Sequence, residues 1–398
     1  MTAAETGVQV RLVDDARRRR EFIRIPWSIY EGDPNWVPPL VMDMKTALDR
    51  DKHPFYQHSD AVFYVAYRDG RAVGRIAAID NARHVEFHDE RVGFFGFFEC
   101  IDDAEVAGAL FEAAGDWLRS RDLKVMRGPT SFSTNDITGF VIEGYDSPPV
   151  LLMPYNPRYY EPLLFRCGFE RVKTMVAFEQ VGNEAPEYLV RAAGVVAKRT
   201  GVRLRPIDMK QFDAELETVQ AIYRDAWEKN WGFVPMTEAE VEFMARELKP
   251  AVDPEFVMIA ELEDGTPVGF SLTMPDYNQA LIHLRNGRLL PFGILKLLWY
   301  RRSIYRIRIM ALGLLEKYRG RGIDVMLYHN IFETGRRKGI THAEFSWVLE
   351  DNEAMRRPLD RLGGRVYKRY ALYEKPLGGS GAASAGADRT PNGGEGPR

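Results

Sequence analysis

The sequence predicts an α/β protein with a mixed sheet, made of two tandem copies of one fold that arose by internal duplication. Length, composition and a repeated pattern lead to this prediction. A chain of 398 residues is longer than one hydrophobic core usually serves, which favours two domains. Hydrophobic residues make up 45% and charged residues 28%, close to the globular average, so most of the chain can fold around cores.

The repeat is visible in two landmarks. An Asp-Gly turn at Asp69 lies between β-branched and aromatic runs at 62–67 and 73–79, and Asp264 heads a matching hairpin 195 residues later. The segments NPRYYEPLLFRCGF (156–169) and NEAMRRPLDRLGG (352–364) place Gly168 and Gly363 at the same offset of 195. Two unrelated α/β domains with similar hairpins are the alternative interpretation.

Both halves predict the same order of elements. The order is a strand, a helical region, the hairpin, a strand, a helix, a strand, the Asn-containing landmark and a final strand. In the first half the strands are 8–13, 91–100, 124–127 and 174–180, with a helix at 104–119; in the second they are 202–206, 306–314, 342–349 and 367–375, with a helix at 324–338. We therefore expect domains at 1–182 and 202–377, a linker helix at 183–201 and a disordered tail at 378–398.

Composition also bounds the function. The net charge of −3 gives no overall attraction to nucleic acid, so we expect no such partner. The first residues lack the apolar core of a signal peptide, and no apolar run approaches the roughly 18 residues that span a bilayer, so a cytoplasmic location is expected. The two cysteines lack the paired spacing of a metal site, and we expect no metal.

The strongest chemical feature is LGLLEKYRGRGI at 312–323, a Gly-rich turn between a predicted strand and helix. Glycines let the backbone approach a ligand, and the free N–H groups at a helix start bind anions. Arg319 and Arg321 add charged donors, so a pyrophosphate would fit. An ordinary tight connection with two solvated arginines is the alternative.

This turn and its context resemble the GNAT superfamily, in which an Arg/Gln-x-x-Gly-x-Gly/Ala turn binds the pyrophosphate of coenzyme A. Arg319 and Gly322 match that pattern, whereas Asp324 stands at its last position, and Leu359 stands where members often have a tyrosine acid. The resemblance implies an acyl-CoA co-substrate. The residues that we expect to bind it are Leu314, Arg319, Gly320, Arg321, Gly322, Ile323 and Asn352; helix capping is the other role open to Asn352.

The first copy lacks this turn. In its place stands FECIDDA at 98–104, in which Glu99, Asp102 and Asp103 would repel phosphate. The first copy therefore resembles a degenerate GNAT domain that helps to shape the acceptor pocket.

Two further segments concern the substrate. The irregular, Gly- and Pro-rich stretch at 127–155 carries candidate acceptor ligands, or is a capped surface loop without a ligand. These candidates are Ser131, Asn135, Asp136 and Tyr155. The apolar stretch 289–305 has Trp299 and Tyr300 at one end of its apolar part, with Arg301, Arg302, Arg306 and Arg308 just beyond them. It predicts an interfacial helix or the mouth of a lipid pocket, with a buried core helix as the alternative.

The segments DPNWVPPL, GPTSFSTND, YNPRYYEPL and YRGRGID together resemble a bacterial family of tandem GNAT-like proteins linked to ceramide synthesis. The resemblance implies transfer of an acyl group from acyl-CoA, or from an acyl carrier protein, to a long-chain amine at the inner-membrane surface. A soluble small-molecule acetyltransferase and a non-catalytic acyl-CoA-binding protein are the alternatives; aminoacyl transfer ranks below them.

Amide formation requires a neutral amine, and hence a base. Glu344 and Glu316 are the first candidates, with Glu350 and Asp351 as alternatives. Backbone N–H groups of 310–315 would polarise the thioester carbonyl, as the family resemblance implies. Tyr370 or Tyr367 would supply an acid, unless the reaction uses none.

Overall fold

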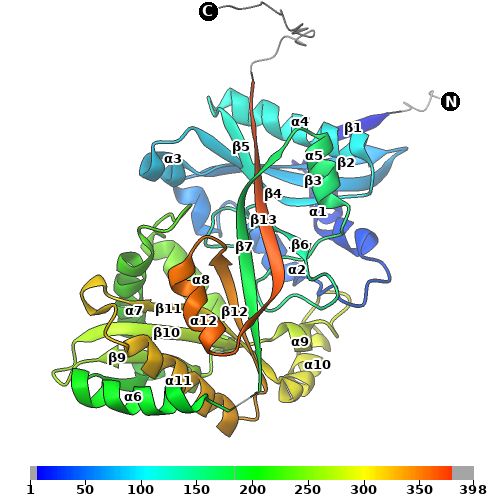
Figure 1. Ribbon diagram of the computed structural model, residues 1–398. Helices are drawn as coiled ribbons and strands as arrows, with labels where there is room; N and C mark the ends of the chain where they lie inside the picture. Colours follow the sequence, from blue (N-terminus) through cyan, green and yellow to red (C-terminus); the bar gives the residue numbers. More distant parts are fainter. Residues whose placement is uncertain (1–6, 183, 379–398) are drawn as a thin grey trace, which may run out of the picture.

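The structure, a computed structural model, describes residues 7–182 and 184–378 (Figure 1). The first half contains β1 (Val8–Leu12), α1 (Ala16–Ile29), α2 (Val41–Ala47), β2 (Asp60–Arg68), β3 (Arg71–Asp80), α3 (Ala82–His88), β4 (Val92–Cys100), α4 (Ala104–Ser120), β5 (Val125–Gly128), β6 (Phe140–Glu143), α5 (Tyr160–Arg166) and β7 (Glu170–Val181). The second contains α6 (Glu187–Thr200), β8 (Arg203–Pro206), α7 (Phe212–Trp227), α8 (Glu238–Leu248), β9 (Val257–Glu261), β10 (Pro267–Pro275), α9 (Asn278–Leu281), α10 (Gly293–Tyr300), β11 (Arg306–Leu314), α11 (Ile323–Arg337), β12 (His342–Leu349), α12 (Glu353–Arg361) and β13 (Arg365–Pro376).

The predicted elements form, including both copies of the repeat. The hairpin β2–β3 turns at Asp69 and Gly70, which have φ of 50° and 73°, the left-handed values that tight hairpin turns require. The hairpin β9–β10 turns through Gly265 with φ of 86°. The mixed sheet is confirmed, because β4–β5 and β11–β12 are parallel pairs in an otherwise antiparallel arrangement.

The strands of both halves join into one sheet. Its order is β1-β2-β3-β4-β5-β13-β7-β12-β11-β10-β9-β8, and β6 pairs with β13 beside this path. The last strand of each half therefore lies next to a strand of the other half: β13 pairs with β5, and β7 pairs with β12. The repeat pattern did not predict this exchange. Figure 1 shows β7 and β13 side by side through the middle of the molecule.

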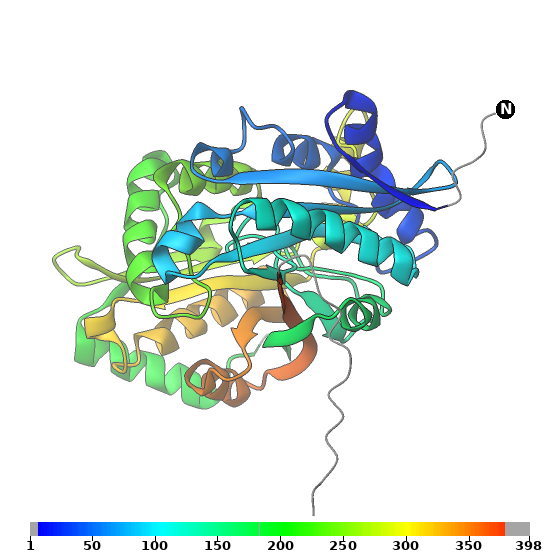
Figure 2. The ribbon, with the colours of Figure 1, turned by 90° about the horizontal axis from the view of Figure 1, so that it is seen from above.

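The exchanged strands also carry core side chains across. Ala371 and Tyr373 of β13 pack in the core that α4 and α5 cover, whereas Val176 and Phe178 of β7 pack beneath α11 and α12. Figure 2 shows α1 and α4 on opposite faces of the first-half strands. Each helix packs on its own hydrophobic core there. The boundary expected at residue 182 follows β7, a strand that already belongs to the core of the second half.

The segment expected to be a linker helix forms α6, which packs on α11 and buries Leu189, Ala193 and Val196. It is therefore part of the second-half core as well as a connection. The tail expected at 378–398 lies outside the described residues apart from Gly378.

We predict that the two halves unfold in one transition, because each needs a strand of the other. Tyr373→Ala should lower the free energy of unfolding by about 3–5 kcal/mol, since it removes a fully buried ring of β13 from the first-half core. Chemical denaturation, followed by tryptophan fluorescence and by far-UV circular dichroism, measures this. Tyr188→Ala, at a 43% exposed position on α6, is the matched control with a small expected effect. Two separate transitions, with only one moved by Tyr373→Ala, would contradict the prediction.

Candidate active site

A fork between β11 and β12 forms the centre of the site. The two strands pair only from Arg306 to Ile309 and from His342 to Phe345, and then separate. At the same level β11 bulges against β10, which leaves Met310 outside the regular register. The fork opens into a cavity of about 1360 Å³ whose lining comes from both halves of the chain.

The predicted phosphate turn lies on this cavity. β11 leads through the 3₁₀ turn η6 (Glu316–Tyr318) to Gly320 and Gly322, with φ of 71° and 85°. Gly322 precedes α11 and no side chain caps this helix, so its first N–H groups are available to an anion. Leu314, Arg319, Gly320 and Asp324 line the cavity.

Of the other residues expected to bind the coenzyme, some lie on the cavity and some do not. Arg319 is held beside the cavity, because its guanidinium donates to the carbonyls of Leu314 and Asp225, each at 3.2 Å. Arg321 is exposed and lies over the ring of Tyr318, and Ile323 is fully buried in the core. Asn352 caps α12 by accepting from the Met355 N–H, and it also lines the cavity.

The corresponding place in the first half is closed. β4 and β5 pair from Val92 to Phe94 and then separate, but the next loop fills the gap: the Thr130 N–H donates to the Phe95 carbonyl at 2.8 Å. At the start of α4 the Asp103 carboxylate accepts from the N–H groups of Glu105 and Val106. A carboxylate of the chain thus already satisfies these N–H groups.

A buried polar cluster lies at the base of the fork. The Ser346 hydroxyl donates to the Glu344 carboxylate at 2.6 Å, and the Arg308 Nε donates to the same hydroxyl at 3.0 Å. Tyr367 also donates to Glu344, at 3.3 Å. Glu344 is fully buried, and burial raises its pKa to about 7, although nearby Arg308 opposes the shift. Arg308 and Ser346 line the cavity, whereas Glu344 lies behind them.

The other two predicted catalytic residues are elsewhere. Glu316 is exposed and forms an ion pair with Lys229 at 2.7 Å, which lowers its pKa. Tyr370 is fully buried, and burial raises its pKa well above the ordinary value. Its hydroxyl has no hydrogen-bond partner among the described residues. Neither side chain lines the cavity.

The irregular stretch at 127–155, the candidate acceptor loop, does reach the cavity: Ser131, Asn135, Asp136 and Tyr155 all line it. Asn135 is engaged within the protein, because its amide donates to the Val234 carbonyl at 2.9 Å and accepts from the Tyr223 hydroxyl at 3.1 Å. The Tyr155 hydroxyl donates to Asp33 at 2.8 Å. Asp136 accepts from the N–H and hydroxyl of Ser133, and its side chain is exposed along the cavity wall.

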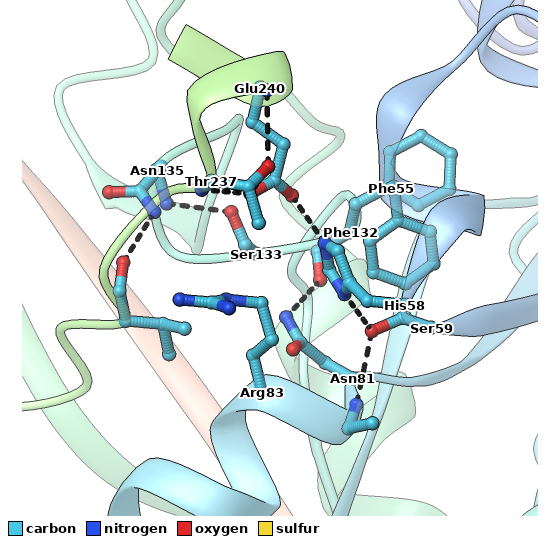
Figure 3. Close-up of polar contacts among 12 residues, drawn as sticks. Phe55, His58, Ser59, Asn81, Arg83, Phe132, Ser133, Asn135, Thr237 and Glu240 are labelled. Carbon is cyan, nitrogen blue, oxygen red and sulfur yellow. Dashed lines mark hydrogen bonds and ion pairs between the residues drawn. The ribbon is translucent and has the colours of Figure 1, made fainter.

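Contacts between the two halves hold this loop. Glu240 of α8 pairs with His58 at 3.0 Å, and His58 is hydrogen-bonded to Ser59 (Figure 3). Asn135 donates to a backbone carbonyl of the segment before α8. Arg83 donates to the Pro235 carbonyl in the same segment. The loop and α8 therefore form one wall of the cavity.

The insert at 289–305 is not a buried core helix, so that alternative is wrong. No residue of α10 is buried, and Trp299 is exposed on the outside instead of lining the cavity. Two of the arginines that we grouped with this insert need correction. Arg306 and Arg308 are buried: Arg306 pairs with buried Asp276 at 2.7 Å, and Arg308 joins the Glu344 cluster.

Sequence reasoning missed Arg308 and Ser346 as site residues. The alternation RIRIM at 306–310 was the available signal, because arginines that alternate with apolar residues in a central strand must face something that satisfies them. Among residues 7–182 and 184–378, no cluster of three or more potential ligands could hold a metal ion. Over the same residues, no helix has both the length and the apolarity to cross a bilayer.

Comparisons with known proteins agree with this geometry. Residues 216–363 match the acetyltransferase (GNAT) family. The chain is 36% identical over 369 residues to a protein of Caulobacter vibrioides called bacterial ceramide synthase, covering 90% of this chain and 94% of the relative. It is 34% identical over 366 residues to the protein YghO of Escherichia coli, covering 90% and 93%.

Solved structures share the fold at low identity. A tandem GNAT protein from the clavulanic acid biosynthesis pathway superposes with a TM-score of 0.56 and 13% identity, covering 94% of this chain and all of that one. A GCN5-related N-acetyltransferase from Sphaerobacter thermophilus has a TM-score of 0.50 and 17% identity, with 93% and 96% covered. The chain therefore belongs to the GNAT family and is an acyl-CoA-dependent N-acyltransferase with the tandem arrangement.

Proposed function

We propose that the protein transfers an acyl group from an acyl thioester to the primary amine of a long-chain base of the sphingoid class. The observation that carries this proposal is the cavity, which runs from the phosphate turn to the first half of the chain. Its volume of about 1360 Å³ exceeds the roughly 300–1,000 Å³ of ordinary small-molecule sites, so two extended substrates can share it.

The lining supports an aliphatic substrate. Away from the turn the walls are mainly apolar and aromatic, from α2, α7, α8 and the adjoining loops. Representative side chains are Met44, Phe55, Phe97, Phe132, Leu216 and Phe243. Such walls favour hydrocarbon chains through burial of apolar surface. The relative called bacterial ceramide synthase, similar over 90% of this chain, supports the same substrate class.

The donor is proposed to lie in the fork, with its pyrophosphate at the start of α11. Arg319 and the uncapped N–H groups after Gly322 would bind the phosphates, and N–H groups of the 310–315 strand would polarise the thioester carbonyl. Acyl-CoA is the expected donor, and an acyl carrier protein is the alternative. Closure of the corresponding place in the first half supports one donor site per chain.

Glu344 is proposed as the base, acting through Ser346. The amine nitrogen attacks the carbonyl carbon, the C–N bond forms, the C–S bond breaks and the thiolate leaves. The nitrogen gives its proton to the Ser346 oxygen while the serine proton passes to Glu344, along the existing 2.6 Å bond. Arg308 donates to the same oxygen and stabilises the charge that develops there. With Leu359 in the usual position of the tyrosine acid, the thiolate would take its proton from water.

A long-chain amine resides in a bilayer, so the reaction is proposed to take place at the inner-membrane surface. A soluble small-molecule acetyltransferase would prefer short donors and polar amines. A non-catalytic acyl-CoA-binding protein would bind the donor without turnover. Chain-length preference therefore distinguishes the two enzymes, and turnover distinguishes both of them from the non-catalytic protein.

The first test is a mass-spectrometric assay with acetyl-CoA and palmitoyl-CoA, each offered with a sphinganine-type base and with short polar amines. We expect N-acylated long-chain base from palmitoyl-CoA. Preference for acetyl-CoA with a short amine would overturn the substrate class, and palmitoyl-CoA binding without product from any amine would indicate the non-catalytic protein.

Gly320→Asp should raise the KM for acyl-CoA at least tenfold, because it places a carboxylate where the pyrophosphate is proposed to bind. Gly339→Asp is the matched control at the other end of α11. The two glycines have φ of 71° and 73°, and an added Cβ meets no atom within 4 Å at either position, so the backbone strain is equal. Steady-state kinetics compares the two variants, and an equal effect would contradict the donor site.

Glu344→Gln should lower kcat by roughly 10²–10⁴-fold, the usual contribution of a general base. A base must be deprotonated, so the wild-type rate should rise as the pH increases through about 7, and this rise should disappear in the variant. Glu316→Gln, at the exposed alternative, should leave both properties unchanged. If Glu316→Gln rather than Glu344→Gln removes the rise near pH 7, the assignment of the base is wrong.

Ser346→Ala should produce a smaller loss of kcat, because water can fill the place of the hydroxyl and still connect the amine to Glu344. The KM for acyl-CoA should change little, since Ser346 lies away from the phosphate turn. Rapid-quench measurement of the chemical step checks this. Full activity in Ser346→Ala would exclude the relay while leaving Glu344 as the base.

A further inference from the structure

The insert between α9 and β11 has an unusual surface. In α10 the half-buried residues are Gly293, Leu297 and Tyr300, spaced as one helical face, while the rest of the helix is exposed. The exposed positions of the insert carry large apolar side chains: Leu290, Phe292, Leu295 and Trp299 are 76%, 71%, 61% and 69% exposed. A surface helix of a soluble protein normally has the opposite arrangement.

Positive charge surrounds these side chains. Arg288, Lys296, Arg301 and Arg302 are all exposed, and the chain contains no acidic residue between Asp276 and Glu316. We call these four residues and the four apolar side chains above the insert surface. Apolar groups that can enter the acyl boundary, together with unopposed cations that meet anionic headgroups, are the two features by which interfacial helices bind bilayers.

Direct contacts connect the insert surface to the cavity wall. Tyr300 stacks on His283 with ring centroids 3.7 Å apart. The loop before the insert then binds the first half: Arg285 donates to the Trp36 carbonyl at 2.9 Å and the Val41 N–H donates to the Gly287 carbonyl at 2.8 Å. Residues 36–40 and Leu281 of α9 line the cavity. Figure 1 shows α9 and α10 together at one edge of the molecule, away from α6.

We infer that the insert surface docks on an anionic lipid bilayer and that the lipid amine enters the cavity beside it, between α9 and residues 36–40. The entry route rests on the proposed function, whereas the docking rests on the exposed apolar and basic side chains alone. A bilayer is favoured over an acidic protein partner because four large apolar side chains are exposed on a single short segment, and an acidic partner would account for the cations but not for these side chains.

The test is co-sedimentation of the full chain with vesicles of phosphatidylcholine, alone or mixed with phosphatidylglycerol. The wild type should bind the anionic vesicles at least tenfold more strongly than the neutral ones. Phe292→Glu/Leu295→Glu and Arg301→Glu/Arg302→Glu should each lower the binding at least tenfold. Val195→Glu, at a 62% exposed apolar position on α6, is the matched control and should bind as the wild type does.

Activity assays separate this inference from the proposed function. With the amine dispersed in detergent, all four proteins should have equal kcat; with the amine in anionic vesicles, only the two double variants should lose rate. Unaltered vesicle binding in the Phe292/Leu295 variant would overturn bilayer docking. Loss of binding in the Arg301/Arg302 variant alone would have the same meaning, because charge and not insertion of apolar side chains would then hold the protein on the vesicles. Vesicle binding without acylation of any amine would leave docking intact and refute the proposed function.

Discussion

The antiparallel pairing of β7 with β13 is the constraint on which the rest of the structure depends. Because β13 completes the strands of the first half and β7 those of the second, neither core is whole without the other half. Two domains joined only by a linker usually move relative to each other. Here one continuous sheet fixes the fork between β11 and β12 against the loop at 127–155. A single cavity therefore faces both, as the proposed transfer between two bound substrates requires.

Much of the fold could be predicted from the sequence, because hairpin turns, alternating strands and Gly-rich turns are local patterns. The strand 342–349 and the turn at Gly320 and Gly322 are examples. The strand exchange could not be predicted, since alternation identifies a strand and not its neighbour. Burial of the arginines could not be predicted for the same reason. Arg301 and Arg302 are exposed, whereas Arg306 and Arg308 are buried. The partners of the buried pair, Asp276 and Ser346, are distant in sequence, so local patterns do not identify them.

The two copies differ in small local features on a shared fold. At the start of α4 a single carboxylate, Asp103, caps the N–H groups, while at the start of α11 the equivalent position is a glycine without a cap. A loop closes the fork of the first half and, in doing so, presents Ser131 and Asp136 to the shared cavity. Under the proposed function, the first copy has no donor site and instead supplies a wall for the acceptor, so the two copies would divide the work between them.

The burial and raised pKa of Glu344 support its proposed role as the base. Its pKa is about 7 in the folded protein against an ordinary value of 4.5, so the unfolded chain releases its proton first. Stability is therefore lost as the pH rises between these values, by about 3 kcal/mol in total. A glutamine in its place would avoid this pH-dependent loss and could still accept from Ser346, but it would remove the negative charge that lies 3.9 Å from the buried Arg308 guanidinium. Strongly shifted pKa values of buried groups are concentrated at functional sites. The Glu344 carboxyl has a pKa near neutrality and is separated from the cavity only by the Ser346 hydroxyl, so it is suited to accept the proton of an amine.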